Sequence, residues 1–167
     1  ENVRIGGAIT TLSGGVDKIV NSLNIGAGVG SRVESAAAEI VASRLPAEDE
    51  LRPLTRATRD MEAALKRDDL EAWAAADERF HQTLVALAGN RMLVQTVANL
   101  WDRAHRARMV TLRMRPKPVS STREHMALVE RLRAGDAAGA VAVNKAHRSR
   151  AGRELLALFE RLRLQHL

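Results

Sequence analysis

Residues 68–90, DDLEAWAAADERFHQTLVALAGN, decide the fold class of this chain. Apolar side chains recur in this stretch at the three- and four-residue spacing of one helical face, at Leu70, Ala74, Leu84 and Ala88. Asp68 with Glu71 is a box-like signal for a helix start, and Gly89 supplies the left-handed residue that commonly ends a helix. The stretch therefore predicts one amphipathic helix with both ends marked.

The chain on either side of this stretch repeats the same pattern. We expect further helices over about residues 31–45, 46–67, 91–114 and 121–134, and a long last helix from 136 onwards. Pro46 suits a first helical position, and Asn90 and Asp136 suit N-caps. Ser121-x-x-Glu124 has the form of a capping box. Because the connections are short, we predict an all-α, antiparallel bundle of about six to seven helices.

Residues 1–30 differ in composition from the rest, since seven of the eleven glycines lie there. We interpret this segment as a connector or arm. Four of its residues follow helical spacing and predict a short amphipathic helix: Val16, Ile19, Val20 and Leu23. Gly26, Gly28 and Gly30 lack the preceding strand and the following Gly-Lys-Ser/Thr of a phosphate loop, so a hinge is the better interpretation.

The composition excludes several classes of protein. The chain has no cysteine, which rules out disulfide scaffolds, thiol nucleophiles and cysteine-ligated zinc fingers, so any metal must use histidine and carboxylate ligands. The net charge of +6 comes from 26 basic residues mixed with 20 acidic ones, and this diffuse charge is weak evidence for nucleic-acid binding. No membrane-spanning segment or signal peptide is visible, and we expect a cytoplasmic protein.

Polar residues interrupt three of the apolar helix faces. Asp77 and His81 lie four residues apart on the face within residues 68–90, so their side chains are adjacent. His125 and His147 lie on the apolar faces of the last two predicted helices. Burying a carboxylate and three imidazoles is costly unless each group is hydrogen-bonded or binds an ion. One shared ion would satisfy all four groups. The alternative is an Asp77–His81 hydrogen bond, with the other two histidines bonded to backbone.

This donor set limits the choice of metal. One aspartate with three imidazoles is a borderline-soft set that suits Zn, Ni, Mn or Fe, of which Zn or Ni is our first expectation. If the four side chains converge with room for water, the ion keeps open positions that can bind a ligand.

A set of motifs in fixed order resembles a known family. The motifs are Asp77-x-x-Phe80-His81-x-x-Leu84, Ala88-Gly89-Asn90-x-x-Leu93, Glu124-His125, and Gly135-Asp136-Ala137 with His147 eleven residues after the aspartate. Val33-Glu34, Ala37-Ala38 and Ala42-x-Arg44 fit the family's first helix. From about Ser31 to the C-terminus, the chain resembles the FCD domain, the C-terminal effector-binding domain of FadR-type regulators in the GntR superfamily.

The resemblance implies a site and partners. In that family an aspartate and three histidines bind a divalent metal inside an antiparallel helical bundle, and a small carboxylate effector often completes the coordination. Asp77, His81, His125 and His147 would be the ligands, in an internal cavity for metal and effector. The resemblance also implies a homodimer that binds operator DNA through an N-terminal winged helix-turn-helix absent from this sequence. Residues 1–30 would be its connector, and residues 31–167 the effector-binding and dimerisation domain.

The residues that would hold the effector are less clearly marked. Many family members use an arginine at the position of Gly30 to hold the effector's carboxylate, and Arg32 is the candidate substitute here. Arg108 can share a helical face with Trp101, and an inward-facing arginine pairs well with a carboxylate. His105 lies near that face and is a candidate hydrogen-bond donor, although a surface position fits its spacing equally well.

Three functions from different classes follow from these observations. The first is a non-enzymatic, ligand-sensing and dimerising domain of a transcription regulator. The second is a small, hydrolase-like metalloenzyme in which the Asp/His₃ ion activates water, with Glu124 as the candidate general base. The third is a metal-free helical interaction module whose core histidines are hydrogen-bonded. We favour the first.

Overall fold

The computed structural model describes residues 28–98, 109 and 111–164 of the 167-residue chain. Every regular element in these residues is helical: residues 28–43 (the first helix), α2 (Glu48–Lys66), α3 (Leu70–Leu87), residues 91–98, the 3₁₀ helix η1 (Leu112–Met114), α5 (Val119–Arg133) and α6 (Ala137–Leu164). The all-α prediction is confirmed. The short helix predicted within residues 1–30 and most of the predicted helix over 91–114 lie outside the described residues.

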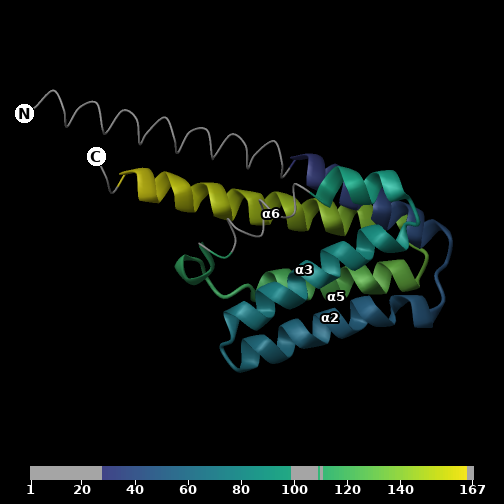
Figure 1. Cartoon of the computed structure of the whole chain (residues 1–167), viewed down its shortest axis with the longest axis horizontal. Coiled ribbons are helices and arrows are strands. Elements are labelled where there is room, and N and C mark those ends of the chain that lie inside the picture. Colours follow the sequence, from purple (N-terminus) through teal and green to yellow (C-terminus); the bar gives the residue numbers. More distant parts are fainter. Residues whose placement is uncertain (1–27, 99–108, 110, 165–167) are drawn as a thin grey trace, which may run out of the picture.

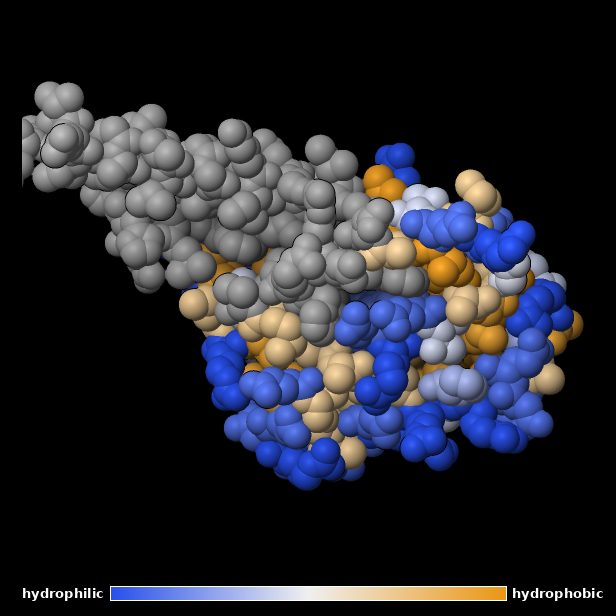
Figure 2. Space-filling view, in the orientation of Figure 1, coloured by the Kyte–Doolittle hydropathy of each residue, from blue (hydrophilic) through white to orange (hydrophobic). Residues whose placement is uncertain are grey.

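The helices form a bundle in which α2 packs against α3 and α5, and α5 packs against α6 (Figure 1). Three residues separate α2 from α3, and three separate α5 from α6, so the chain reverses direction at each connection. The largest fully buried apolar side chains are Phe80, Leu51, Leu54, Met61, Leu84 and Leu132. Figure 2 shows hydrophilic and apolar side chains interspersed over the described part of one face, with hydrophilic ones gathered along its lower edge.

The predicted ends of α3 and α5 are confirmed. Gly89 and Gly135 have φ angles of +68° and +67°, the left-handed conformation that glycine adopts without a steric penalty. The next helices begin directly afterwards with polar caps. Asn90 Oδ1 accepts a hydrogen bond from the Met92 N–H at 2.9 Å, and Asp136 Oδ1 accepts one from the Gly139 N–H at 2.8 Å.

The predicted starts of α2 and α3 are slightly wrong. Pro46 precedes α2, which begins at Glu48, and the Glu50 side chain accepts a hydrogen bond from the Ala47 N–H at 2.9 Å. The N-cap of α3 is Asp69, whose carboxylate accepts from the Ala72 N–H at 2.9 Å. The preceding Asp68 has a φ of +59° and lies in the turn.

The capping box predicted at Ser121 and Glu124 is wrong. The helix begins two residues earlier, at Val119. Ser121 is buried inside α5, where its hydroxyl accepts a hydrogen bond from Arg150 Nη2 at 2.9 Å. Both side chains of the expected box therefore contact α6, and contacts between helices outweigh the local motif.

The indole of Trp73 belongs to the core, since it is 3% exposed and its Nε1 donates to Thr122 Oγ1 at 2.9 Å. In the described part of the chain, no helix combines the length and the apolar character needed to cross a membrane.

Candidate metal centre

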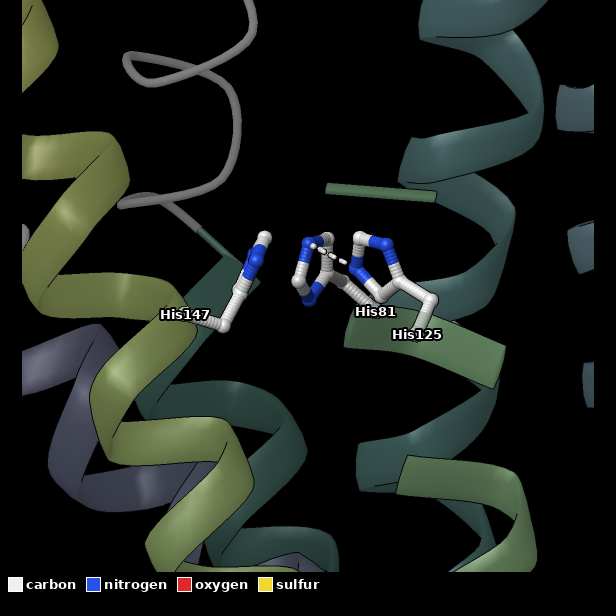
Figure 3. A group of neighbouring side chains, drawn as sticks. All are labelled: His81, His125 and His147. Atoms are coloured by element: carbon white, nitrogen blue, oxygen red, sulfur yellow. Dashed lines mark hydrogen bonds between the residues drawn. The ribbon is translucent and has the colours of Figure 1, made fainter. Parts of the chain in front are cut away.

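Three histidines from three helices meet in the interior of the bundle. His81 comes from α3, His125 from α5 and His147 from α6, and all three are at most 6% exposed. Each offers a ring nitrogen within 4.8 Å of the others, and Figure 3 shows the three rings gathered at one point. Their convergence follows from the apolar faces that carry them, since each face must be buried against its neighbours.

The fourth predicted residue lies at the same point. Asp77 is 2% exposed and precedes His81 by one helical turn. Its Oδ1 is 3.7 Å from Nε2 of His81 and 3.7 Å from Nε2 of His125. Both distances are longer than a direct hydrogen bond. One oxygen of Asp77 therefore faces two imidazole nitrogens at equal distances.

The residues present fit a divalent ion. The Nε2 atoms of His81 and His125 are 3.3 Å apart. Two nitrogens bound at about 2.0–2.1 Å to one tetrahedral ion would be about 3.3 Å apart, so the rings already have the spacing of shared ligands. Three imidazoles and one carboxylate are donors that first-row divalent metals accept. The geometry brings the three histidines within reach of one ion, and Asp77 lies beside two of them.

Two glutamates lie behind the histidines: Glu34, which the sequence did not assign to the site, and Glu124, which it offered only as a general base. Glu34 of the first helix is fully buried, and its Oε2 is 3.1 Å from Nδ1 of His81. Glu124 of α5 places its Oε2 2.7 Å from Nδ1 of His147. A signal for Glu34 exists in the sequence, because it lies on the otherwise apolar face of Ala37, Ala38 and Val41, as Asp77 does on its own helix.

The pKa values of the three histidines are not all shifted in the same direction in the metal-free site. Burial acts to lower the pKa of His81, but the carboxylates of Glu34 and Asp77 outweigh it and raise that pKa. Burial, together with the neighbouring His147, lowers the pKa of His125 well below its usual range. Burial also lowers the pKa of His147. Near pH 7, His125 and His147 are therefore neutral and have a lone pair for a metal ion, whereas His81 must release a proton to bind one.

The predicted effector residues are not brought to this cluster by the described part of the chain. Arg32 is exposed on the first helix. His105 and Arg108 lie outside the described residues. All three remain predictions.

Comparisons with known proteins agree with this fold and show the family to which the chain belongs. A family model for the FCD domain matches residues 31–150, which include all four clustered residues. The chain belongs to the FCD domain family. The resemblance inferred from the sequence motifs is thereby confirmed.

Two individual proteins are similar to this chain. The solved structure of the metal-free FCD domain of TM0439 superimposes with a TM-score of 0.64, covering 86% of this chain and 95% of that one at 22% identity, which shows a shared fold. An uncharacterized HTH-type transcriptional regulator in the TAR-I ttuE-ttuC′ intergenic region of Agrobacterium vitis is 53% identical over 55 residues. That match spans 32% of this chain and 32% of the relative.

Proposed function

We propose that this chain is the ligand-sensing, metal-binding and dimerising domain of a GntR-superfamily, FadR-type transcription regulator. The observation that carries the proposal is the buried cluster of Asp77, His81, His125 and His147 within the part of the chain matched by the FCD family. The name of the Agrobacterium vitis relative, an HTH-type regulator, supports the regulatory role. Operator DNA would be bound by an N-terminal domain outside these residues, in a cytoplasmic homodimer.

The charge of the site favours an anionic ligand. A divalent ion held by one aspartate and three neutral imidazoles leaves a net charge of +1 in a buried place, and this charge attracts a carboxylate. When bound, the ion supplies open coordination positions for the oxygens of a small carboxylate effector. His81, His125 and His147 belong to three different helices. The distances between their rings therefore depend on whether metal and effector occupy the site.

The regulatory step follows from that dependence. We expect the pair of helices carrying His125 and His147 to close around the occupied site and to shift the first helix, which continues from the predicted connector. A ligand changes this equilibrium only by its differential affinity for the two arrangements.

The metalloenzyme alternative needs a general base beside the site, and the contacts of Glu124 argue against that role. Its Oε2 lies against Nδ1 of His147, on the side of the ring opposite Nε2, and both of its oxygens accept hydrogen bonds from Arg150 at 2.6 and 2.7 Å. A carboxylate held in this way is poorly placed to take a proton from water at the centre. We therefore propose a non-enzymatic role.

A thermal-shift screen of small mono- and dicarboxylates tests this function. We expect at least one carboxylate to raise the melting temperature of the zinc-loaded protein, and to have no effect on the zinc-free protein or on an Asp77→Ala/His147→Ala double variant. Stabilisation that persists without metal and in the double variant would contradict the proposed effector site. Hydrolysis of activated esters by the zinc-loaded protein, abolished in the double variant, would instead support the metalloenzyme.

A further inference from the structure

Two histidines of the centre are held from behind by carboxylates of other helices. Nδ1 of His147 on α6 is hydrogen-bonded to Oε2 of Glu124 on α5 at 2.7 Å, whereas Nδ1 of His81 on α3 lies 3.1 Å from Oε2 of Glu34 on the first helix without the alignment of a hydrogen bond. A histidine has two ring nitrogens, and the one that faces a carboxylate keeps its hydrogen. In His147 this leaves the Nε2 lone pair for a metal, whereas His81 must first release its Nε2 proton.

We propose that Glu34 and Glu124 are positioning residues of the metal centre, each accepting the Nδ1–H of one histidine so that Nε2 points at the ion. The proposal rests on the proposed metal binding and adds two residues that are not among the four predicted ligands. Such outer partners fix the orientation and tautomer of a ligating imidazole and increase its basicity.

Arginines of α6 pair with both carboxylates. Arg148 Nε lies 3.6 Å from Glu34 Oε2, and Arg150 donates to both oxygens of Glu124. Burial alone would raise the pKa of each glutamate and favour its neutral form, which accepts hydrogen bonds more weakly. The arginine and histidine partners outweigh burial and hold both pKa values below the usual range.

The first helix makes room for one of these arginines. A Cβ added at Gly30 would lie 3.3 Å from Arg148 Nη2, so the absence of a side chain lets the guanidinium lie close to the helix backbone. Gly30 precedes Glu34 by four residues, about one helical turn. The same helix therefore accommodates Arg148 and provides the carboxylate that pairs with it.

The two contact chains differ in the helices that they join. Arg150, Glu124 and His147 join α6 with α5, whereas Arg148, Glu34 and His81 join α6, the first helix and α3. The first helix provides none of the four predicted ligands, yet Glu34 ties it to the ring of His81. The proposal therefore gives the site a direct contact with the helix that follows residues 1–27 in the sequence.

The test compares zinc affinity across matched variants. The site variants are Glu34→Ala, Glu34→Gln, Glu124→Ala and Glu124→Gln, and the controls are Glu39→Gln and Glu130→Gln, which alter exposed glutamates of the first helix and of α5. Zinc affinity is measured by competition with a chromogenic chelator. We expect both Ala variants to bind zinc about 10- to 100-fold more weakly than the wild type, which is the usual effect of removing an outer hydrogen-bond partner of a ligand. The Gln variants keep an acceptor oxygen for Nδ1–H, so their zinc affinity should fall less. The control variants should bind zinc as tightly as the wild type does.

Nitrogen-15 NMR of the histidine rings provides a readout that a purely structural role would not change. At pH 8 the metal-free wild type should show His147 as the Nδ1–H tautomer. The tautomer equilibrium of His147 should shift towards Nε2–H in Glu124→Ala, whereas Glu124→Gln should keep the Nδ1–H tautomer. In the zinc-loaded wild type, His81 and His147 should retain Nδ1–H with zinc on Nε2.

The outcomes separate the two proposals. A wild type that takes up no zinc would refute the proposed function, whatever the tautomers. Normal uptake by the wild type with equal affinity in both Ala variants, or an Nε2–H tautomer of His147 in the metal-free wild type, would overturn the positioning roles alone. If an Ala variant fails to fold, the matched Gln variant and the wild-type tautomers still decide the question.

Discussion

The substitution His147→Ala should remove most of the stabilisation that zinc gives to this domain. At a free zinc concentration about 100-fold above the wild-type dissociation constant, binding adds about 2.7 kcal/mol to the free energy of unfolding. Loss of one of four ligands should weaken binding at least as much as loss of an outer partner does, by about 100-fold. At the same zinc concentration the variant would then gain only about 0.4 kcal/mol.

These free energies correspond to measurable shifts in melting temperature. For a domain of this size, about 1 kcal/mol shifts the melting temperature by roughly 3 °C, so zinc should raise it by roughly 8 °C in the wild type and about 1 °C in His147→Ala. Removing the ring should leave no orphaned charge, because Glu124 keeps both of its hydrogen bonds from Arg150. Differential scanning calorimetry with and without zinc measures both shifts.

Asn144→Ala is the matched control for this experiment. Asn144 precedes His147 on the same buried face of α6, is 1% exposed, and donates to Ser35 Oγ at 3.1 Å. Its loss should lower the basal stability by about 1–3 kcal/mol and leave the zinc-dependent shift unchanged. A full zinc-dependent shift in His147→Ala, or its loss in Asn144→Ala, would refute the reasoning.

Three further predictions concern the fold. Gly135→Ala should destabilise the protein more than Gly89→Ala in urea denaturation, because both have a positive φ but only at Gly135 would a Cβ clash with a neighbouring side chain; equal losses would contradict this. Trp73→Phe should cost about 1 kcal/mol in the same assay, by breaking the hydrogen bond to Thr122, and an unchanged midpoint would contradict it. Folding lowers the pKa of Glu34 from 4.5, so its ionised carboxylate should stabilise the protein above pH 4.5 and stop doing so as the pH falls below that value. The free energy of unfolding should therefore fall more steeply with acidification in the wild type than in Glu34→Gln, and equal slopes would contradict this.

The sequence was sufficient to predict the all-helical fold and the meeting of His81, His125 and His147. An aspartate and a histidine on the apolar face of one helix must find partners inside the bundle, and the same reasoning applied to His125 and His147. The glycines at the ends of α3 and α5 were also predictable, because the left-handed conformation is a local property of the backbone.

The sequence was not sufficient for contacts between distant residues. The Ser121-x-x-Glu124 pattern has the local form of a capping box, yet both side chains contact Arg150 of α6, 29 and 26 residues away. The contact between Glu34 and His81 likewise joins separate helices. Such contacts depend on how the helices pack, and local spacing carries no information about it.

The metal content of the protein tests the central claim most directly. Elemental analysis would be made on protein purified without a metal-affinity tag, beside the Asp77→Ala/His147→Ala double variant. The account predicts about one divalent ion per chain in the wild type, and its loss in the variant. A wild type that holds no ion even after metal is added back, or a variant that keeps the ion, would contradict it.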